Sequence, residues 1–133
     1  MVGNDVCNEK DDTVAHMTSV TEFHDNVVAT LEFLEEQLPP GSHVILVGLI
    51  DGAILYKAMA KRLHPLGLLR KDLTYANVYD WFNCMEIGPC HGWMTQNATL
   101  RAITTAHAQR LSQVLAKIAQ GKKKFTRFDV HYM

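Results

Sequence analysis

The stretch His43-Val-Ile-Leu-Val-Gly-Leu49 decides the fold of this chain. It is apolar without alternation, which is typical of a β-strand that is covered on both faces. Pro39-Pro40-Gly41 precedes it as the end of another element, and Asp51-Gly52 follows it as a turn. We therefore expect a buried strand with helices packed on its sheet.

The segment before the strand is predicted to be a helix. Ser19-Val-Thr-Glu22 fits a capping box, in which a hydroxyl and a carboxylate bind the first free N–H groups. Apolar residues then recur at steps of three and four, which gives one apolar stripe. Its members are Val20, Phe23, Val27, Leu31, Leu34 and Leu38.

Three more helices and a second strand are predicted after the turn. The helices cover residues 53–63, 74–83 and 98–120, and the strand covers residues 125–132. This order is typical of an α/β sheet with parallel crossovers. Because two strands are too few for a finished parallel sheet, we expect residues 1–133 to be an interior slice of one larger α/β domain.

The composition excludes several classes of protein. The chain has 133 residues and a mass of 15.0 kDa, with 47% apolar and 20% charged residues, so it is globular and not disordered. The net charge of −1 argues against a general nucleic-acid binder. No apolar run approaches the ~20 residues that span a bilayer. The first residues have neither a basic start nor an apolar core, so no signal peptide is visible.

The charge is unevenly distributed along the chain. Residues 1–36 carry a net charge of −8, and the remainder carries +7. The cluster of Lys122-Lys123-Lys124 and Arg127 could bind phosphate. Solvated lysines at a helix C-terminus, which complement the helix dipole, are the favoured interpretation.

The three serines do not predict a catalytic triad. Ser19 is explained as a helix cap, Ser42 as part of the turn before a strand, and Ser112 as the polar side of a helix. None lies in a Gly-x-Ser-x-Gly or Gly-Asp-Ser setting, and no histidine has an Asp three residues before it. A nucleophile and its base are therefore not identifiable.

The three cysteines allow several interpretations. Cys84, Cys90 and His91, with His64 as a fourth ligand, could assemble a metal site, but the spacing matches no common zinc motif. A disulfide between Cys84 and Cys90, closing a short Gly/Pro loop, is favoured. Cys7 would then be free or paired with a cysteine outside these residues. No metal site is expected.

Asn97-Ala-Thr99 has the sequence of a glycosylation acceptor. Asn97 could equally be the N-cap of the helix that follows. An acceptor site beside a disulfide suits an oxidising, secretory environment, so we expect Asn97 to lie at the surface.

Gly3-Asn4-Asp5 also allows two interpretations. An Asn that follows a Gly in a loop usually stabilises a turn. Alternatively, an Asn amide on a loop at the carboxyl edge of a sheet can donate to a developing oxyanion, with the Gly allowing close approach.

Several segments resemble one family of enzymes. Val2-Gly-Asn-Asp-Val-Cys7 resembles the Gly-Asn-Asp block of SGNH (GDSL-type) hydrolases. Longer segments resemble the acyloxyacyl hydrolase family within them, and this resemblance extends over nearly the whole chain. These are Gly41-Ser-His-Val-Ile-Leu-Val-Gly-Leu-Ile-Asp-Gly52, His64-Pro-Leu-Gly67, Lys71-Asp-Leu-Thr-Tyr-Ala76, Pro89-Cys-His-Gly-Trp-Met94, Asn97-Ala-Thr-Leu-Arg101 and Phe128-Asp-Val-His-Tyr132.

The resemblance implies a fold and an activity. Residues 1–133 would be part of a three-layer α/β/α, flavodoxin-like SGNH domain with a parallel sheet. The family consists of secreted or lysosomal lipases that remove secondary fatty acyl chains from lipid A of bacterial lipopolysaccharide. In these enzymes a saposin-like lipid-binding domain precedes the catalytic domain.

The same resemblance implies site residues. Gly3 and Asn4 fall on the oxyanion-hole block, with Asn4 as the donor. The Ser block and the Asp-x-x-His block have no counterpart, because Asp129-Val-His131 has the wrong spacing. We therefore expect the chain alone to be inactive. No cofactor is expected, and the partner would be an acylated lipid, lipopolysaccharide or lipid A, with no nucleic acid and no transmembrane segment.

Two other functions stay open. A non-catalytic binding or interaction module could retain the SGNH scaffold. A weaker alternative is a small lectin-like or metal-binding domain built around residues 84–91. The missing strands would leave sheet edges and apolar faces bare, which predicts aggregation or self-association.

Overall fold

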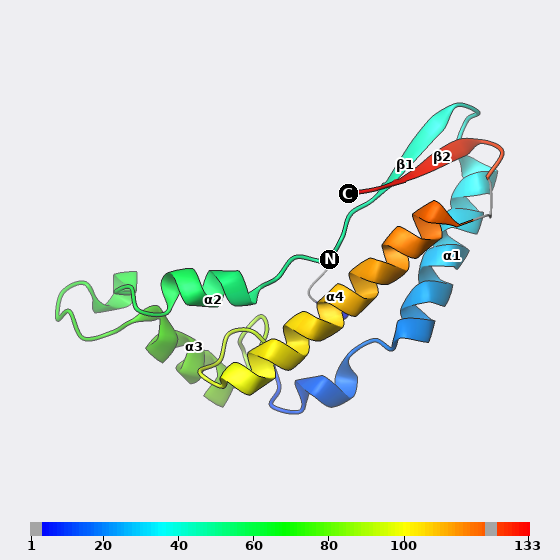
Figure 1. Ribbon diagram of the computed structural model, residues 1–133. Helices are drawn as coiled ribbons and strands as arrows, with labels where there is room; N and C mark the ends of the chain where they lie inside the picture. The colour runs from blue at the N-terminus through cyan, green and yellow to red at the C-terminus, as the bar shows by residue number, and fades with distance from the viewer. Residues whose placement is uncertain (1–3, 122–124) are drawn as a thin grey trace. The chain divides into compact units, whose positions relative to one another are not determined.

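The computed structural model describes residues 4–121 and 125–133 (Figure 1). The chain divides into two compact units. We call residues 18–49 and 109–133 the sheet unit, and residues 1–17 and 50–108 the disulfide unit. Helix α4, Ala98–Gln120, contributes residues to both. In the part of the chain described, no helix is both long enough and apolar enough to cross a bilayer.

The sheet unit contains two parallel strands, β1 (Ser42–Leu46) and β2 (Phe128–Tyr132), which pair along their whole length. Figure 1 shows the two arrows side by side. The backbone hydrogen bonds continue past β1, because the Gly48 N–H donates to the carbonyl of Met133 at 2.8 Å. The predicted α/β class with a parallel sheet is confirmed.

Helix α1, Val20–Gln37, begins and ends where the sequence predicts. The Ser19 hydroxyl accepts a hydrogen bond from the Glu22 N–H at 3.2 Å, which confirms the hydroxyl half of the predicted capping box. The other half is wrong, since no bond from the Ser19 N–H to the Glu22 carboxylate forms among the described residues. Leu38 already has extended backbone, and the prolines after it cannot continue a helix. Leu31, from the middle of the predicted stripe, is buried.

The burial of β1 differs from the prediction. The apolar run predicted a strand covered on both faces, but burial alternates along it, and His43 and Ile45 are exposed. Successive side chains of a strand point to opposite faces, and one face of this described sheet is open. The strand also ends at Leu46, whereas the apolar run continues to Leu49.

A carboxylate on α1 fixes the segment that leads into β2. Glu35 accepts hydrogen bonds from the Thr126 N–H at 2.7 Å and the Arg127 N–H at 3.3 Å, and the Thr126 hydroxyl also donates to it. The hydroxyl of Thr126 is the main reason that the pKa of Glu35 lies below its usual value. Arg127 also donates to the Leu38 carbonyl at 3.2 Å, so it has a structural role. The other members of its cluster, Lys122-Lys123-Lys124, lie outside the described residues.

The disulfide unit is built from short elements and loops. It contains two 3-10 turns, η1 (Thr13–His16) and η2 (Pro65–Gly67), and two short helices, α2 (Ala53–Met59) and α3 (Tyr75–Cys84). The predicted helices at residues 53–63 and 74–83 are thus confirmed, but the first of them ends four residues early.

The early end of α2 has a physical cause. Leu63 pairs with Thr74 in an isolated antiparallel bridge, and the His64 N–H donates to the carbonyl of Leu73 at 2.9 Å. These long-range bonds require the chain to leave the helix before residue 63. Periodicity within the helix gives no sign of them.

Candidate functional site

Of the two predicted oxyanion-hole residues, the structure describes Asn4. Residues 4–6 form a turn in which Asn4 is exposed, while Val6 and Cys7 are buried. Within the described residues no hydrogen bond engages the Asn4 side chain, so its amide is free to donate to a ligand. Gly3, the other predicted residue of this site, lies outside the described residues.

A disulfide between Cys7 and Cys90 holds this turn to a loop that lies 83 residues away in the sequence. The two Cα atoms are 5.2 Å apart. The Asn8 carbonyl accepts a hydrogen bond from the His91 N–H at 2.8 Å directly beside the disulfide. A covalent bond and a hydrogen bond therefore fix the residues that follow Asn4.

The predicted Cys84–Cys90 disulfide is wrong. Cys84 is free and exposed at the end of α3, whereas Cys90 is buried against Cys7. After α3 the chain turns back, because Glu86 adopts a positive φ of 52° and the Ile87 N–H donates to the Phe82 carbonyl at 3.0 Å. Cys84 is thereby left at the surface, and the short loop that suggested the pairing does not bring the two sulfurs together.

Gly92 allows the two loops to approach. A Cβ atom at this position would lie 2.6 Å from the Thr104 hydroxyl oxygen and 3.3 Å from the Cys7 Cβ. Only a residue without a Cβ fits there, since the first of these separations is far below van der Waals contact. The loop at residues 90–95 is therefore pressed between the Asn4 turn and helix α4.

A chain of hydrogen bonds fixes the other end of this loop. The indole N–H of Trp93 donates to the Thr105 hydroxyl at 3.1 Å, and that hydroxyl donates to the Asp51 carboxylate at 2.7 Å. Asp51 also accepts from the Ala53 N–H at 3.0 Å. Trp93 lies so close to Gly52 that a Cβ there would be 2.3 Å from its ring. The Trp93 indole, the Thr105 hydroxyl and one oxygen of Asp51 are thus all paired, which restricts the motion of the loop.

Sequence reasoning did not find this network. The available signal was the position of Asp51-Gly52 after a buried strand, because ligand sites of α/β folds gather at the carboxyl ends of strands. Sequence alone predicts only a turn for this pair. Thr105 gave no signal, since one threonine in a long helix is indistinguishable from a surface residue.

The three serines have structural roles. Ser19 is the N-cap of α1, as predicted, and the Ser42 hydroxyl donates to the Pro39 carbonyl at 2.8 Å, as suits the predicted turn. The Ser112 hydroxyl accepts from the Leu49 N–H at 2.8 Å. This last bond ties the segment after β1 to helix α4, a role that the prediction of a polar helix face did not include.

The residues of the alternative metal site do not form one. Cys90 is part of a disulfide, and the ring Nδ1 of His64 accepts a hydrogen bond from the Leu66 N–H at 3.2 Å. Among residues 4–121 and 125–133, no three metal-ligating side chains gather.

Asn97 is exposed and begins helix α4. Its side-chain oxygen accepts a hydrogen bond from the Leu100 N–H at 3.1 Å, which confirms the N-cap interpretation. A glycan would attach through the side-chain nitrogen, which this bond does not use. Glycosylation of Asn97 therefore stays a prediction that is compatible with its cap.

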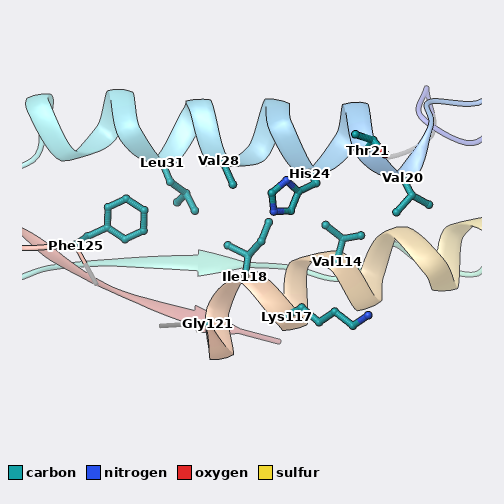
Figure 2. A pocket seen from close by; sticks show the side chains of 10 residues that line it. All are labelled: Val20, Thr21, His24, Val28, Leu31, Val114, Lys117, Ile118, Gly121 and Phe125. Carbon is teal, nitrogen blue, oxygen red and sulfur yellow. The ribbon is translucent and has the colours of Figure 1, made fainter. Parts of the chain in front are cut away.

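A cavity of about 630 Å³ lies in the sheet unit between α1 and the end of α4 (Figure 2). Figure 2 shows apolar side chains from both helices, among them Val28, Leu31 and Ile118, around it. Gly121 and Phe125, which also line it, flank residues 122–124, and we assign it no ligand.

Known proteins that match this chain share one name. No family model matches it. The acyloxyacyl hydrolases of Homo sapiens and Oryctolagus cuniculus are 50% identical to it, over 133 and 134 aligned residues, and that of Mus musculus is 48% identical over 133. Each match covers 100% of this chain and 23% of the relative's length. Along its whole length, the chain therefore belongs by sequence to the acyloxyacyl hydrolase family.

Proposed function

We propose that this chain is part of the SGNH-type catalytic domain of an ester hydrolase that removes fatty acyl chains from lipid A, and that Asn4 is an oxyanion-hole donor. The observation that carries the proposal is the anchoring of the Asn4 turn, where an exposed amide precedes a buried and disulfide-bonded Cys7. The reaction class comes from the family to which the chain belongs.

The chemistry of ester cleavage explains why an anchored amide is useful. Attack on the ester places negative charge on the former carbonyl oxygen, and a fixed N–H donor binds that charge more strongly in the transition state than in the ground state. Because Cys7 and Asn8 are already held, little reorganisation is needed when the charge develops. Asn4 would act in this way, with Gly3 giving the substrate room.

We place the nucleophilic serine and the histidine base of the reaction outside these 133 residues. The hydroxyls of Ser19, Ser42 and Ser112 are engaged in a helix cap, a turn and a loop. The chain alone is then expected to release no product from a p-nitrophenyl ester or from lipopolysaccharide. Turnover that depends on one of these serines would contradict this placement.

We further propose a secreted or lysosomal location. The Cys7–Cys90 disulfide needs an oxidising compartment to form and persist. The exposed acceptor Asn97 suits the same compartment. Self-association stays a prediction, supported by Ile45 and Val47, which are 54% and 61% exposed.

The test is a chimaera in which this chain replaces the matching segment of the human acyloxyacyl hydrolase. We expect the chimaera to release fatty acid from lipopolysaccharide, with the unmodified human enzyme as the control. A secreted, folded chimaera that binds lipopolysaccharide and releases no fatty acid would contradict the proposal. That result would favour a non-catalytic module on the same scaffold.

A further inference from the structure

Residues 61–71, between α2 and α3, present leucine side chains to solvent; we call this segment the leucine loop. Leu66 is 76% exposed, Leu68 is 59% exposed and Leu69 is 99% exposed. Single exposed apolar residues are ordinary, but three within four positions form a cluster whose exposure to water is unfavourable. The cluster lies in the disulfide unit, on the loop that joins the end of α2 to the start of α3 (Figure 1).

The leucines are held outward by an ordered backbone. The Gly67 N–H donates to the His64 carbonyl at 2.8 Å, and the Lys71 N–H donates to the Gly67 carbonyl at 2.7 Å. Gly67 is buried against Leu73, where a Cβ would come within 2.6 Å of the Leu73 side chain. The loop therefore cannot fold its leucines inward without breaking these contacts.

Basic side chains flank the leucines on both sides. Lys61 and Arg62 precede them, Arg70 and Lys71 follow them, and all four are exposed. Within the described residues none of the four forms an ion pair with a carboxylate. Apolar side chains between unpaired cations match an anionic lipid surface, where leucines enter the acyl region and cations bind the phosphates.

We propose that the leucine loop docks the protein onto an anionic lipid surface. A second copy of the chain is a poor occupant, because it would bring four cations against four cations. A purely apolar protein groove is also a poor occupant, because it would bury the cations without partners. Docking in this way needs no ester cleavage, so it is independent of the role of Asn4.

The test measures sedimentation of the 133-residue chain with vesicles of phosphatidylcholine alone and with added phosphatidylglycerol. We expect binding to the anionic vesicles at low salt and much weaker binding to the neutral ones. Leu68→Ser with Leu69→Ser should lower the partition coefficient about tenfold or more. Arg62→Gln with Arg70→Gln should lower it about 25-fold at low salt and far less at high salt.

The matched control is Phe33→Ser, which removes an exposed aromatic side chain on α1 that lies among Glu32, Glu35 and Glu36. It should leave binding unchanged, because that surface repels anionic lipid. Equal losses in Phe33→Ser and in the leucine variant, or no binding by the unaltered chain, would overturn the proposal. A leucine variant that changes the oligomeric state and leaves vesicle binding intact would also overturn it, in favour of a second copy.

Discussion

Different interactions stabilise the interior of the sheet unit and the interior of the disulfide unit. In the sheet unit, regular elements meet through backbone hydrogen bonds between β1 and β2. In the disulfide unit, the Asn4 turn, the loop at residues 90–95 and the start of α2 meet through one disulfide and the side chains of Thr105 and Asp51. Backbone pairing tolerates many sequences, whereas the second arrangement depends on single side chains. The candidate functional residues all lie in the second unit.

Removal of the Cys7–Cys90 disulfide should give the largest effect. Cys7→Ser leaves the Asn4 turn attached mainly through the Asn8–His91 hydrogen bond. For cysteines 83 residues apart, loop-closure entropy predicts a loss of about 4.5 kcal/mol in the free energy of unfolding. Urea unfolding followed by tryptophan fluorescence measures this loss.

The matched control for that variant is Cys84→Ser, because Cys84 is free and exposed. It should change the free energy of unfolding by less than about 0.5 kcal/mol. Non-reducing peptide mapping should also show Cys7 joined to Cys90 in the Cys84→Ser protein. If Cys84→Ser destabilised the chain as much as Cys7→Ser, the contrast between the two units would lose its main support.

A smaller effect is expected from Thr105→Val, which preserves the shape of the side chain and removes its hydroxyl. The Trp93 indole N–H and the Asp51 carboxylate would both lose a partner in a part-buried place. We expect a loss of about 1–3 kcal/mol. Thr99→Val, at an exposed position of the same helix, should cost little. Thermal melts of the two variants compare them directly, and equal melting temperatures would show that the network adds no stability.

The smallest effect is a pH dependence in the sheet unit. The pKa of Glu35 is lowered in the folded protein, mainly by the Thr126 hydroxyl, so the ionised carboxylate stabilises the fold. This contribution is present above the ordinary pKa of Glu and fades as the pH falls through the lowered value. Melting temperatures measured from pH 6 down to the acid range should therefore decline slightly less steeply in Glu35→Gln than in the unaltered chain. An identical decline of the two melting temperatures would show that the Glu35 carboxylate does not stabilise the segment that leads into β2.

The sequence predicted the sheet unit well for a physical reason. The cap at Ser19, the stop at Pro39-Pro40 and the apolar run of β1 are local signals that act within a few residues. The open face of β1 was missed, because burial depends on which other elements cover the sheet. Local sequence patterns thus predicted where the helix and strand of this unit lie, and did not predict how deeply they are buried.

The disulfide unit was predicted less well, since its contacts join residues far apart in the chain. The short Cys84–Cys90 spacing favoured a pairing that the end of α3 excludes, and nothing near Cys7 indicated Cys90. The bridge between Leu63 and Thr74 shortened α2 without any local sign. Asn4 was found through a family motif and not through periodicity, and its catalytic role stays a prediction.

The most direct measurement of the central claim is the kinetics and thermal melt of Asn4→Ala in the active chimaera. If Asn4 is an oxyanion donor, its removal should lower kcat by about 10²–10³, which equals about 2.7–4 kcal/mol. KM and melting temperature should stay nearly unchanged. Asn8→Ala is the control, because the Asn8 side chain bonds only the Lys10 N–H in the described chain and should leave kcat intact. An unchanged kcat with a lowered melting temperature in Asn4→Ala would contradict the account and reduce Asn4 to a turn residue.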